Sequence, residues 1–141
     1  KDIFNYNKYS TGHFLDLGLS YDFDHAFEVP LRLKWTTVFA GRDLNLAGHN
    51  RYSSFVYAEY SVFRDEHWIV DLGLGGTFAF NRSDEDGNQN FYGRDNINQI
   101  SIRTTYRLKL GRYKMPIFAH AMWNPDARKG YLQVGVDLFA F

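Results

Sequence analysis

The feature that most constrains the fold of this chain is a period-two alternation of apolar and polar residues, which recurs in seven long stretches. Successive side chains of a β-strand point to opposite faces, so a period of two is typical of a strand. In one stretch, a single face holds Ile100, Ile102, Tyr106, Leu108 and Leu110. The predicted strands are residues 11–23, 29–41, 52–64, 67–81, 98–111, 115–123 and 130–141.

The length of these strands favours a membrane-spanning structure. They run for about ten to fifteen residues, whereas the strands of soluble proteins usually run for about five or six. A tilted strand that crosses a membrane needs roughly 9–11 residues. We therefore expect an all-β fold, an antiparallel up-and-down transmembrane β-barrel of about eight strands that forms one domain over residues 1–141.

The charged residues lie on one face of each strand. In the six strands that alternate cleanly, the apolar face contains no Asp, Glu, Lys or Arg. Strand 52–64 is less regular, because Phe55, Tyr57 and Phe63 share the parity of Glu59. A membrane barrel turns its apolar faces to lipid and its charges to the lumen. The predicted lumen charge network is Asp16, Asp22, Arg32, Lys34, Glu59, Asp71, Arg103, Arg107, Lys109, His120 and Asp137.

An eight-stranded barrel has an interior only wide enough for side chains. We therefore expect the lumen charges to pair with one another and fill the interior. A narrow ion path or a gated pore is the alternative interpretation of the same residues.

The connections between the strands alternate in length. Segments 24–28, 65–66 and 112–114 are shorter than segments 42–50, 82–95 and 124–129. Outer-membrane barrels have short periplasmic turns and longer extracellular loops, so the three longer segments are predicted to face outside and both termini to lie in the periplasm. An even number of strands needs one more strand before residue 11. Residues 2–7 are the candidate; otherwise residues 1–10 are an extension, or the chain is part of a larger barrel.

The segment YLQVGVDLFAF resembles the C-terminal signature of bacterial outer-membrane β-barrels, and residues 11–141 resemble the small eight-stranded type. Residues 115–136 also resemble uncharacterised porin-like families. The first resemblance implies that Phe141 is the signal for the insertion machinery. In that signature the terminal aromatic shares a face with apolar residues, whereas Phe141 shares parity with Asp137 and Gly135. A bulge near Phe139 would restore the register.

Composition excludes several other functions. The 141 residues carry 16 Lys and Arg against 16 Asp and Glu, so no net charge attracts a nucleic acid, and no such partner is expected. The absence of cysteine excludes disulfides, thiolate catalysis and cysteine-ligated metals. No window approaches the roughly eighteen apolar residues of a transmembrane helix. No signal-peptide pattern begins at Lys1, so any such peptide is expected to have been removed. No cofactor is expected.

The loop at residues 81–96 offers hard oxygen ligands of the kind that Ca²⁺ prefers, in Asp84, Glu85, Asp86, Asn88 and Asn90. The spacing does not fit an EF-hand, because Gly87 is fourth from Asp84 and not sixth. We predict no metal site and a solvated loop rich in turn-forming residues. Phe91 and Tyr92 are then candidates to contact a partner or outer-leaflet sugars.

His120 is the strongest candidate for catalysis. Outer-membrane barrels that deacylate lipid A place a His and a Ser near one another on a late strand, but Met122 takes the position of that Ser here. By parity His120 also faces the lumen, away from lipid. No catalytic residue is therefore expected. Trp68 and Trp123 lie near strand ends, as interfacial anchors do, whereas Trp35 lies deeper.

The function expected from these observations is a structural or interaction role in the bacterial outer membrane; an accessory subunit of a larger assembly is one form that this role can take. The expected partners are the lipid bilayer, outer-leaflet lipid and proteins of that assembly. Leu44 and Leu46 make the loop at residues 42–50 suitable for a protein contact. The alternatives are a narrow channel or porin, a lipid-modifying enzyme, and a soluble lipocalin-like barrel with its apolar faces inward.

Overall fold

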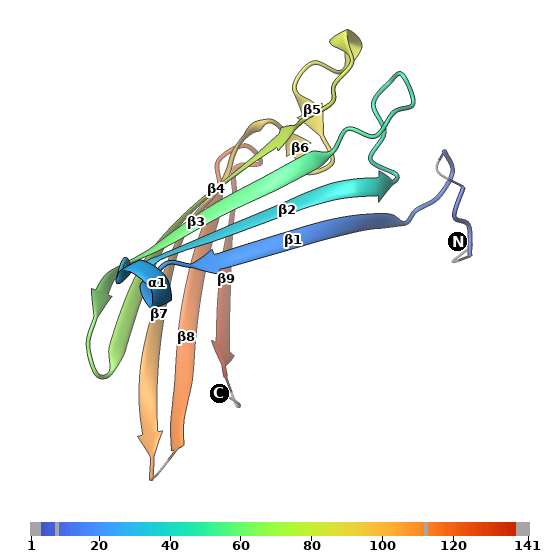
Figure 1. Ribbon diagram of the computed structural model, residues 1–141. Helices are drawn as coiled ribbons and strands as arrows, with labels where there is room; N and C mark the ends of the chain where they lie inside the picture. Colours follow the sequence, from blue (N-terminus) through green and yellow to red (C-terminus); the bar gives the residue numbers. More distant parts are fainter. Residues whose placement is uncertain (1–3, 8, 112, 138–141) are drawn as a thin grey trace. The chain divides into compact units, whose positions relative to one another are not determined.

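The computed structural model describes residues 4–7, 9–111 and 113–137, which form one seven-stranded antiparallel sheet (Figure 1). Its strand order is β1-β2-β3-β4-β7-β8-β9, so neighbours along the chain are neighbours in the sheet. The strands are β1 (Phe14–Asp22), β2 (Leu31–Gly41), β3 (Ser53–Arg64), β4 (Trp68–Ala79), β7 (Asn96–Leu110), β8 (Tyr113–Asn124) and β9 (Lys129–Val136).

The remaining elements are short and lie in the connections. Helical turn α1 (Asp24–Phe27) joins β1 to β2, and 3₁₀ turn η1 (Asp84–Asp86) follows β4. Strands β5 (Gln89–Asn90) and β6 (Gly93–Arg94) form a separate two-stranded sheet before β7. Among the residues that the structure describes, no helix is long and apolar enough to cross a membrane.

The all-β, antiparallel fold predicted from the alternation is confirmed, and each of the seven predicted strands is present. The sheet is not closed, because β1 and β9 end the strand order. Barrel closure and membrane insertion therefore stay predictions. Of the candidate extra strand at residues 2–7, the described residues 4–7 form no strand, and residues 2 and 3 lie outside the described residues.

The contacts divide the chain into two compact units, which we describe separately. Unit 1 comprises residues 1–21, 34–57 and 76–96, so it holds one end of β1 to β4 and the two longest loops. Unit 2 comprises residues 22–33, 58–75 and 97–141, and it holds the opposite end of those strands together with β7, β8 and β9.

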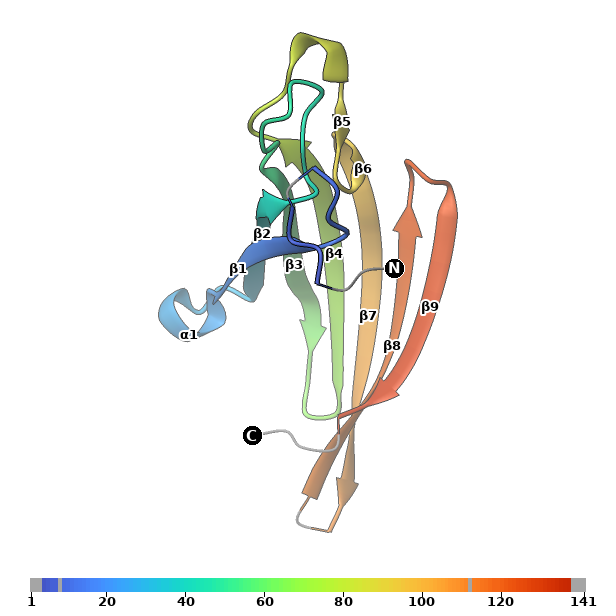
Figure 2. The same ribbon diagram turned by 90° about the vertical axis from the view of Figure 1, so that its right-hand side faces the viewer.

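Within unit 2, the register of β7, β8 and β9 separates polar from apolar side chains. Arg103 pairs with His120, and His120 pairs with Gln133. One residue further along, Ile102 pairs with Ala121, which pairs with Leu132. Directly paired residues point to the same face of a sheet. The parities predicted from the sequence are therefore those that the strands adopt, and Figure 2 shows β8 and β9 side by side.

Burial is inverted relative to a water-soluble protein, in which large apolar side chains form the core. Among the described residues, the buried apolar side chains are Val38 and Ala79 alone. The buried polar residues are Asp43, Asn45, Ser53, Ser54, Thr77, Asp86, Asn90, Ser101 and Thr105. Large apolar side chains at alternate strand positions are exposed, and we call them the apolar face: Leu15, Leu17, Leu19, Trp35, Phe39, Val62, Trp68, Leu72, Leu74, Ile100, Ile102, Trp123, Leu132 and Val134.

In unit 1, Gly41 brings the end of β2 against the start of β1. Its φ is +99°, a conformation that favours glycine. A Cβ at this position would lie 2.3 Å from the backbone oxygen of His13. The next amide, of Arg42, donates a hydrogen bond to that oxygen at 3.0 Å. Only a residue without a side chain permits this approach.

Candidate functional site

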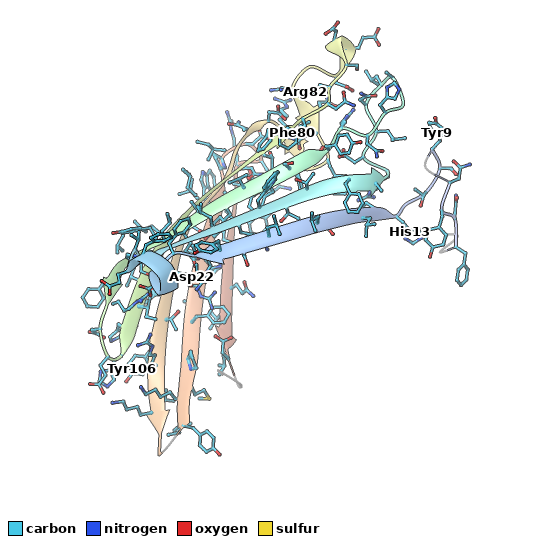
Figure 3. The ribbon with its side chains drawn as sticks, in the orientation of Figure 1. Tyr9, His13, Asp22, Phe80, Arg82 and Tyr106 are labelled. Atoms are coloured by element: carbon cyan, nitrogen blue, oxygen red, sulfur yellow. The ribbon has the colours of Figure 1, made fainter. Side chains whose placement is uncertain are left out.

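Three of the predicted lumen charges form a cluster in unit 2, near α1. Arg32 on β2 forms ion pairs with Asp22 on β1 and with Glu59 on β3, each at 3.2 Å. Figure 3 marks Asp22, which lies close to α1. The strands place these three side chains on one face, as their parity predicts. Because the Arg32 side chain is 55% exposed, the pairs position the strands more than they stabilise them.

A small cavity of about 80 Å³ lies beside this triad. Ser61 and Asp71, which line it, are joined by a hydrogen bond from the hydroxyl to the carboxylate. Arg64, also in the lining, forms an ion pair with Asp24 in α1. The predicted residue Asp71 thus belongs to the same cluster as Asp22, Arg32 and Glu59.

The predicted bases Arg107 and Lys109 of β7 contact the turn between β3 and β4, which directly follows Arg64. Lys109 pairs with Glu66, and the guanidinium of Arg107 donates to the backbone oxygen of Asp65 at 3.4 Å. Both acceptors belong to the tight turn between β3 and β4. There the backbone amides of Trp68 and His67 donate to the Asp65 carboxylate, which lowers the pKa of Asp65. The hydrogen bond from Lys109 likewise lowers the pKa of Glu66.

Arg103 and His120 form a second cluster with different surroundings. The Arg103 guanidinium lies 4.1 Å above the centre of the Phe118 ring and 3.9 Å from the Asp137 carboxylate. Nε of Arg103 and Nε2 of His120 are both buried, and neither has a hydrogen-bond partner among the described residues. Arg103, His120 and Asp137 were all predicted on this face.

Two predicted lumen residues lie in unit 1, apart from any of these clusters. Asp16 and Lys34 are both exposed. Asp16 acts on Tyr92, since burial raises the pKa of the Tyr92 hydroxyl and the negative charges of Asp16 and Asp43 raise it further. The predicted anchors Trp68 and Trp123 are exposed on the apolar face. The predicted insertion signal Phe141 lies outside the described residues.

A buried polar site of unit 1, centred on Asp86, was not predicted. The Asp86 carboxylate in η1 is fully buried and accepts hydrogen bonds from Ser83 N and Oγ, from Leu46 N and from Arg51. Burial alone would raise the pKa of Asp86, but these four donors outweigh it and lower the pKa to about 2.

A second set of buried hydrogen bonds, centred on Ser53, joins Asp43 in the first long loop (residues 42–50) to Phe91 in the second (residues 82–95). The Asp43 carboxylate accepts from the amide and the hydroxyl of Ser53, each at 2.8 Å. The Ser53 hydroxyl in turn accepts from the amide of Phe91 at 2.9 Å. We call Asp43, Leu46, Arg51, Ser53, Asp86 and Phe91 the loop cluster. The loop at residues 81–96, predicted as solvated, is therefore partly buried, because Asp86 and Asn90 are buried.

The outer surface of the loop cluster is aromatic and basic. The Arg42 guanidinium lies 4.9 Å from the ring centre of Phe91 and 5.5 Å from that of Phe14. Leu46 is 66% exposed. Figure 3 shows Phe80 and Arg82 near the start of the second loop, where Arg82 pairs with Asp95 at 2.6 Å.

The acidic side chains of Asp84, Glu85 and Asp86 do not form a group that could bind a metal ion. Asp84 and Glu85 are exposed, whereas Asp86 is occupied by its four donors. Among the described residues, no group of three or more His, Cys, Asp or Glu could hold a metal ion.

The sequence did contain one signal for the loop cluster. Ser83 and Asp86 have the three-residue spacing of a capping box, and the structure forms both of its reciprocal hydrogen bonds. Nothing local signals Arg51 or Leu46 as partners, because they lie 35 and 40 residues away.

No family model, no curated protein and no solved structure matches this chain.

Proposed function

We propose that this chain is an integral β protein of the bacterial outer membrane with a structural or interaction role. The supporting observation is the inverted burial, since the apolar face stays exposed while Ser, Thr, Asn and Asp are buried. Large apolar side chains exposed in such number are unfavourable in water. In a bilayer the same surface contacts lipid, and the charges of the other face line an interior.

The loop cluster supports an interaction role for the loops. Buried hydrogen bonds donated to Asp86 and to the Ser53 hydroxyl fix loops that most often move freely in other proteins. They present Leu46 and the Arg42–Phe91 pair outward. A fixed loop loses little entropy when it binds, so such a surface suits contact with a protein of a larger outer-membrane assembly or with outer-leaflet lipid.

A narrow channel is the second candidate, favoured by the charged face of unit 2. Arg32, Asp22 and Glu59 on one side and Arg103, Arg107 and Lys109 on another would line a lumen if the sheet closes. A channel must conduct in a planar bilayer, and Arg103→Ala or Asp71→Ala should change its conductance. The structural role predicts no conductance.

A lipid-modifying enzyme would need a nucleophile next to His120. Ser101 pairs with Met122, two residues along from the Arg103–His120 pair, and Nε2 of His120 has no hydrogen-bond partner among the described residues. We therefore propose a non-enzymatic role. An enzyme would change the mass of lipid A in cells, and His120→Ala would abolish that change.

The test of membrane insertion is a comparison of unheated and boiled samples on an SDS gel, after extraction in mild detergent. A closed barrel resists SDS until it is heated, because its backbone hydrogen bonds leave no free edge. A shift in mobility supports the proposal. The absence of a shift, with a soluble monomer in detergent-free buffer, would favour the lipocalin-like alternative. Co-purification of a protein partner from the mild-detergent extract separates the accessory role from a lone barrel.

A further inference from the structure

The strongest unexplained feature lies on the charged face of unit 2, where Arg103, His120 and Gln133 form one row across β7, β8 and β9. Directly paired residues on a sheet have Cβ atoms about 5 Å apart. The three side chains are therefore immediate neighbours. All three carry N–H donors, and none is a carboxylate.

The Phe118 ring packs against the guanidinium of Arg103. The guanidinium lies 4.1 Å from the centre of the ring, which is the geometry of a cation–π contact. The Phe118 ring lies over Gly135, since a Cβ on that glycine would come within 2.5 Å of the ring. Gly135 pairs with Phe118 in the register. The absence of a side chain at residue 135 therefore lets Phe118 lie flat beneath Arg103.

Within the described part of the chain, two polar atoms of the row lack hydrogen bonds, whereas the third residue, Gln133, is exposed. Nε of Arg103 and Nε2 of His120 are buried without a hydrogen-bond partner among the described residues. The Asp137 carboxylate is 3.9 Å from the guanidinium, which is too long for a hydrogen bond. Leaving a buried polar atom without a hydrogen bond is costly, so native proteins usually pair such an atom with a protein, water or ligand atom.

We propose that Arg103, His120 and Gln133 form a binding site for a small oxyanion, a carboxylate or a phosphate group. A planar guanidinium matches the spacing of two oxygens in such a group, and the neighbouring imidazole and amide supply further donors. Asp137 is the internal competitor for Arg103, at a distance that lets an incoming anion displace it. This site goes beyond the proposed membrane role, because it depends only on the β7–β8–β9 register.

The experiment follows the Arg103 Nε–H resonance by NMR in the folded chain, in detergent micelles or in detergent-free buffer, whichever keeps it folded. Inorganic phosphate and acetate are titrated separately, with chloride adjusted to keep the ionic strength constant. The site predicts a saturable shift of this resonance. Saturation by phosphate alone or by acetate alone identifies the group that the site prefers. Saturation by neither overturns the proposal.

Variants separate the site from general attraction between charges. Arg103→Lys keeps the charge and removes the planar fork and Nε, so it should weaken binding about tenfold, measured at the backbone amide of His120 in the wild-type and variant chains. Arg107→Lys is the matched control, since Arg107 lies on the same strand and face but already donates to the Asp65 backbone. It should change binding less than about twofold. Equal losses in the two variants would overturn the site.

His120→Gln provides a second test should Arg103→Lys fail to fold. Glutamine keeps an N–H donor, so binding should survive, whereas His120→Leu removes the donor and should weaken binding severalfold. Anion binding to His120→Gln and to His120→Leu is measured from the shift of the Arg103 Nε–H resonance. If His120→Leu binds as tightly as His120→Gln, His120 does not belong to the site.

Discussion

Replacement of Asp86 by asparagine should release the loop cluster. In the native chain the Asp86 carboxylate receives Leu46 N at 3.1 Å, Arg51 at 2.8 Å and two donors of Ser83. An amide cannot accept all four bonds or neutralise Arg51, whose side chain is only 15% exposed. A half-buried guanidinium would then lack its counter-charge.

The magnitude follows from two independent considerations. Removing one partner of a buried ion pair costs about 3–5 kcal/mol. The pKa of Asp86, lowered from 3.8 to about 2, corresponds to about 2 kcal/mol of stabilisation by the ionised form. We therefore expect Asp86→Asn to lower the free energy of opening of the loop cluster by about 2–4 kcal/mol.

The same pKa sets the pH dependence. The pKa of Asp86 is lower in the folded loop than in the open loop, so ionisation stabilises the folded form. This stabilisation is complete above about pH 4 and is lost as the pH falls toward about 2. In Asp86→Asn this particular loss should be absent, because no proton binds at residue 86.

Hydrogen exchange at the backbone amide of Leu46 measures this opening directly. Protection of Leu46 should fall by at least about thirtyfold in Asp86→Asn at pH 6, and it should fall in the wild-type chain between pH 4 and 2. Asp84→Asn is the matched control, since Asp84 lies exposed in the same turn. Unchanged Leu46 protection in Asp86→Asn, or an equal loss in Asp84→Asn, would refute the reasoning.

Three further substitutions give independent outcomes. Gly41→Ala should destabilise unit 1 by about 1–3 kcal/mol, because it combines a positive φ with a clash on the His13 backbone. Hydrogen exchange at the backbone amide of Arg42 measures this loss, and an exchange rate equal to that of the wild-type chain would contradict it. Gly135→Ala should displace the Phe118 ring and weaken oxyanion binding at Arg103 severalfold in the same NMR titration, and unchanged affinity would show that the ring does not support the guanidinium. Leu74→Arg should destabilise the chain by about 2–4 kcal/mol if residue 74 contacts lipid, measured as urea-induced unfolding in vesicles, whereas a cost near zero would place this residue in water.

The strands could be predicted because their signal is local. Each strand shows its period of two without reference to any other part of the chain, and pairing of neighbours follows from short connections. The row Arg103–His120–Gln133 was predicted only as three residues of one parity. Their direct pairing depends on the register, which Leu110↔Tyr113 and Asn124↔Lys129 set at the two hairpins.

The loop cluster could not be predicted, because its contacts join residues that are far apart in the sequence. Asp86 and Arg51 are separated by 35 residues, and the sequence between them contains a whole strand hairpin. Turn-forming residues such as Asp86 and Asn90 have the composition of a solvated loop, although their side chains are buried here. The capping-box spacing of Ser83 and Asp86 was the one local signal.

Closure of the sheet also lies beyond what periodicity predicts. The alternation fixes which face each side chain takes, but it does not specify the partner of an edge strand. The described residues 4–7 contribute no strand next to β1, and β9 ends at Val136.

The contact between the apolar face and lipid can be measured most directly by spin labelling in vesicles. The chain has no cysteine, so each single-cysteine variant carries one label at one known position. Leu72→Cys and Leu74→Cys label the apolar face of β4, and Ile69→Cys and Asp71→Cys label the other face. If the apolar face contacts lipid, labels at 72 and 74 will be accessible to molecular oxygen and shielded from a water-soluble nickel chelate, whereas labels at 69 and 71 will not show this pattern. Equal access of the nickel chelate to 72 and 74 would place the apolar face in water and contradict the proposed membrane role.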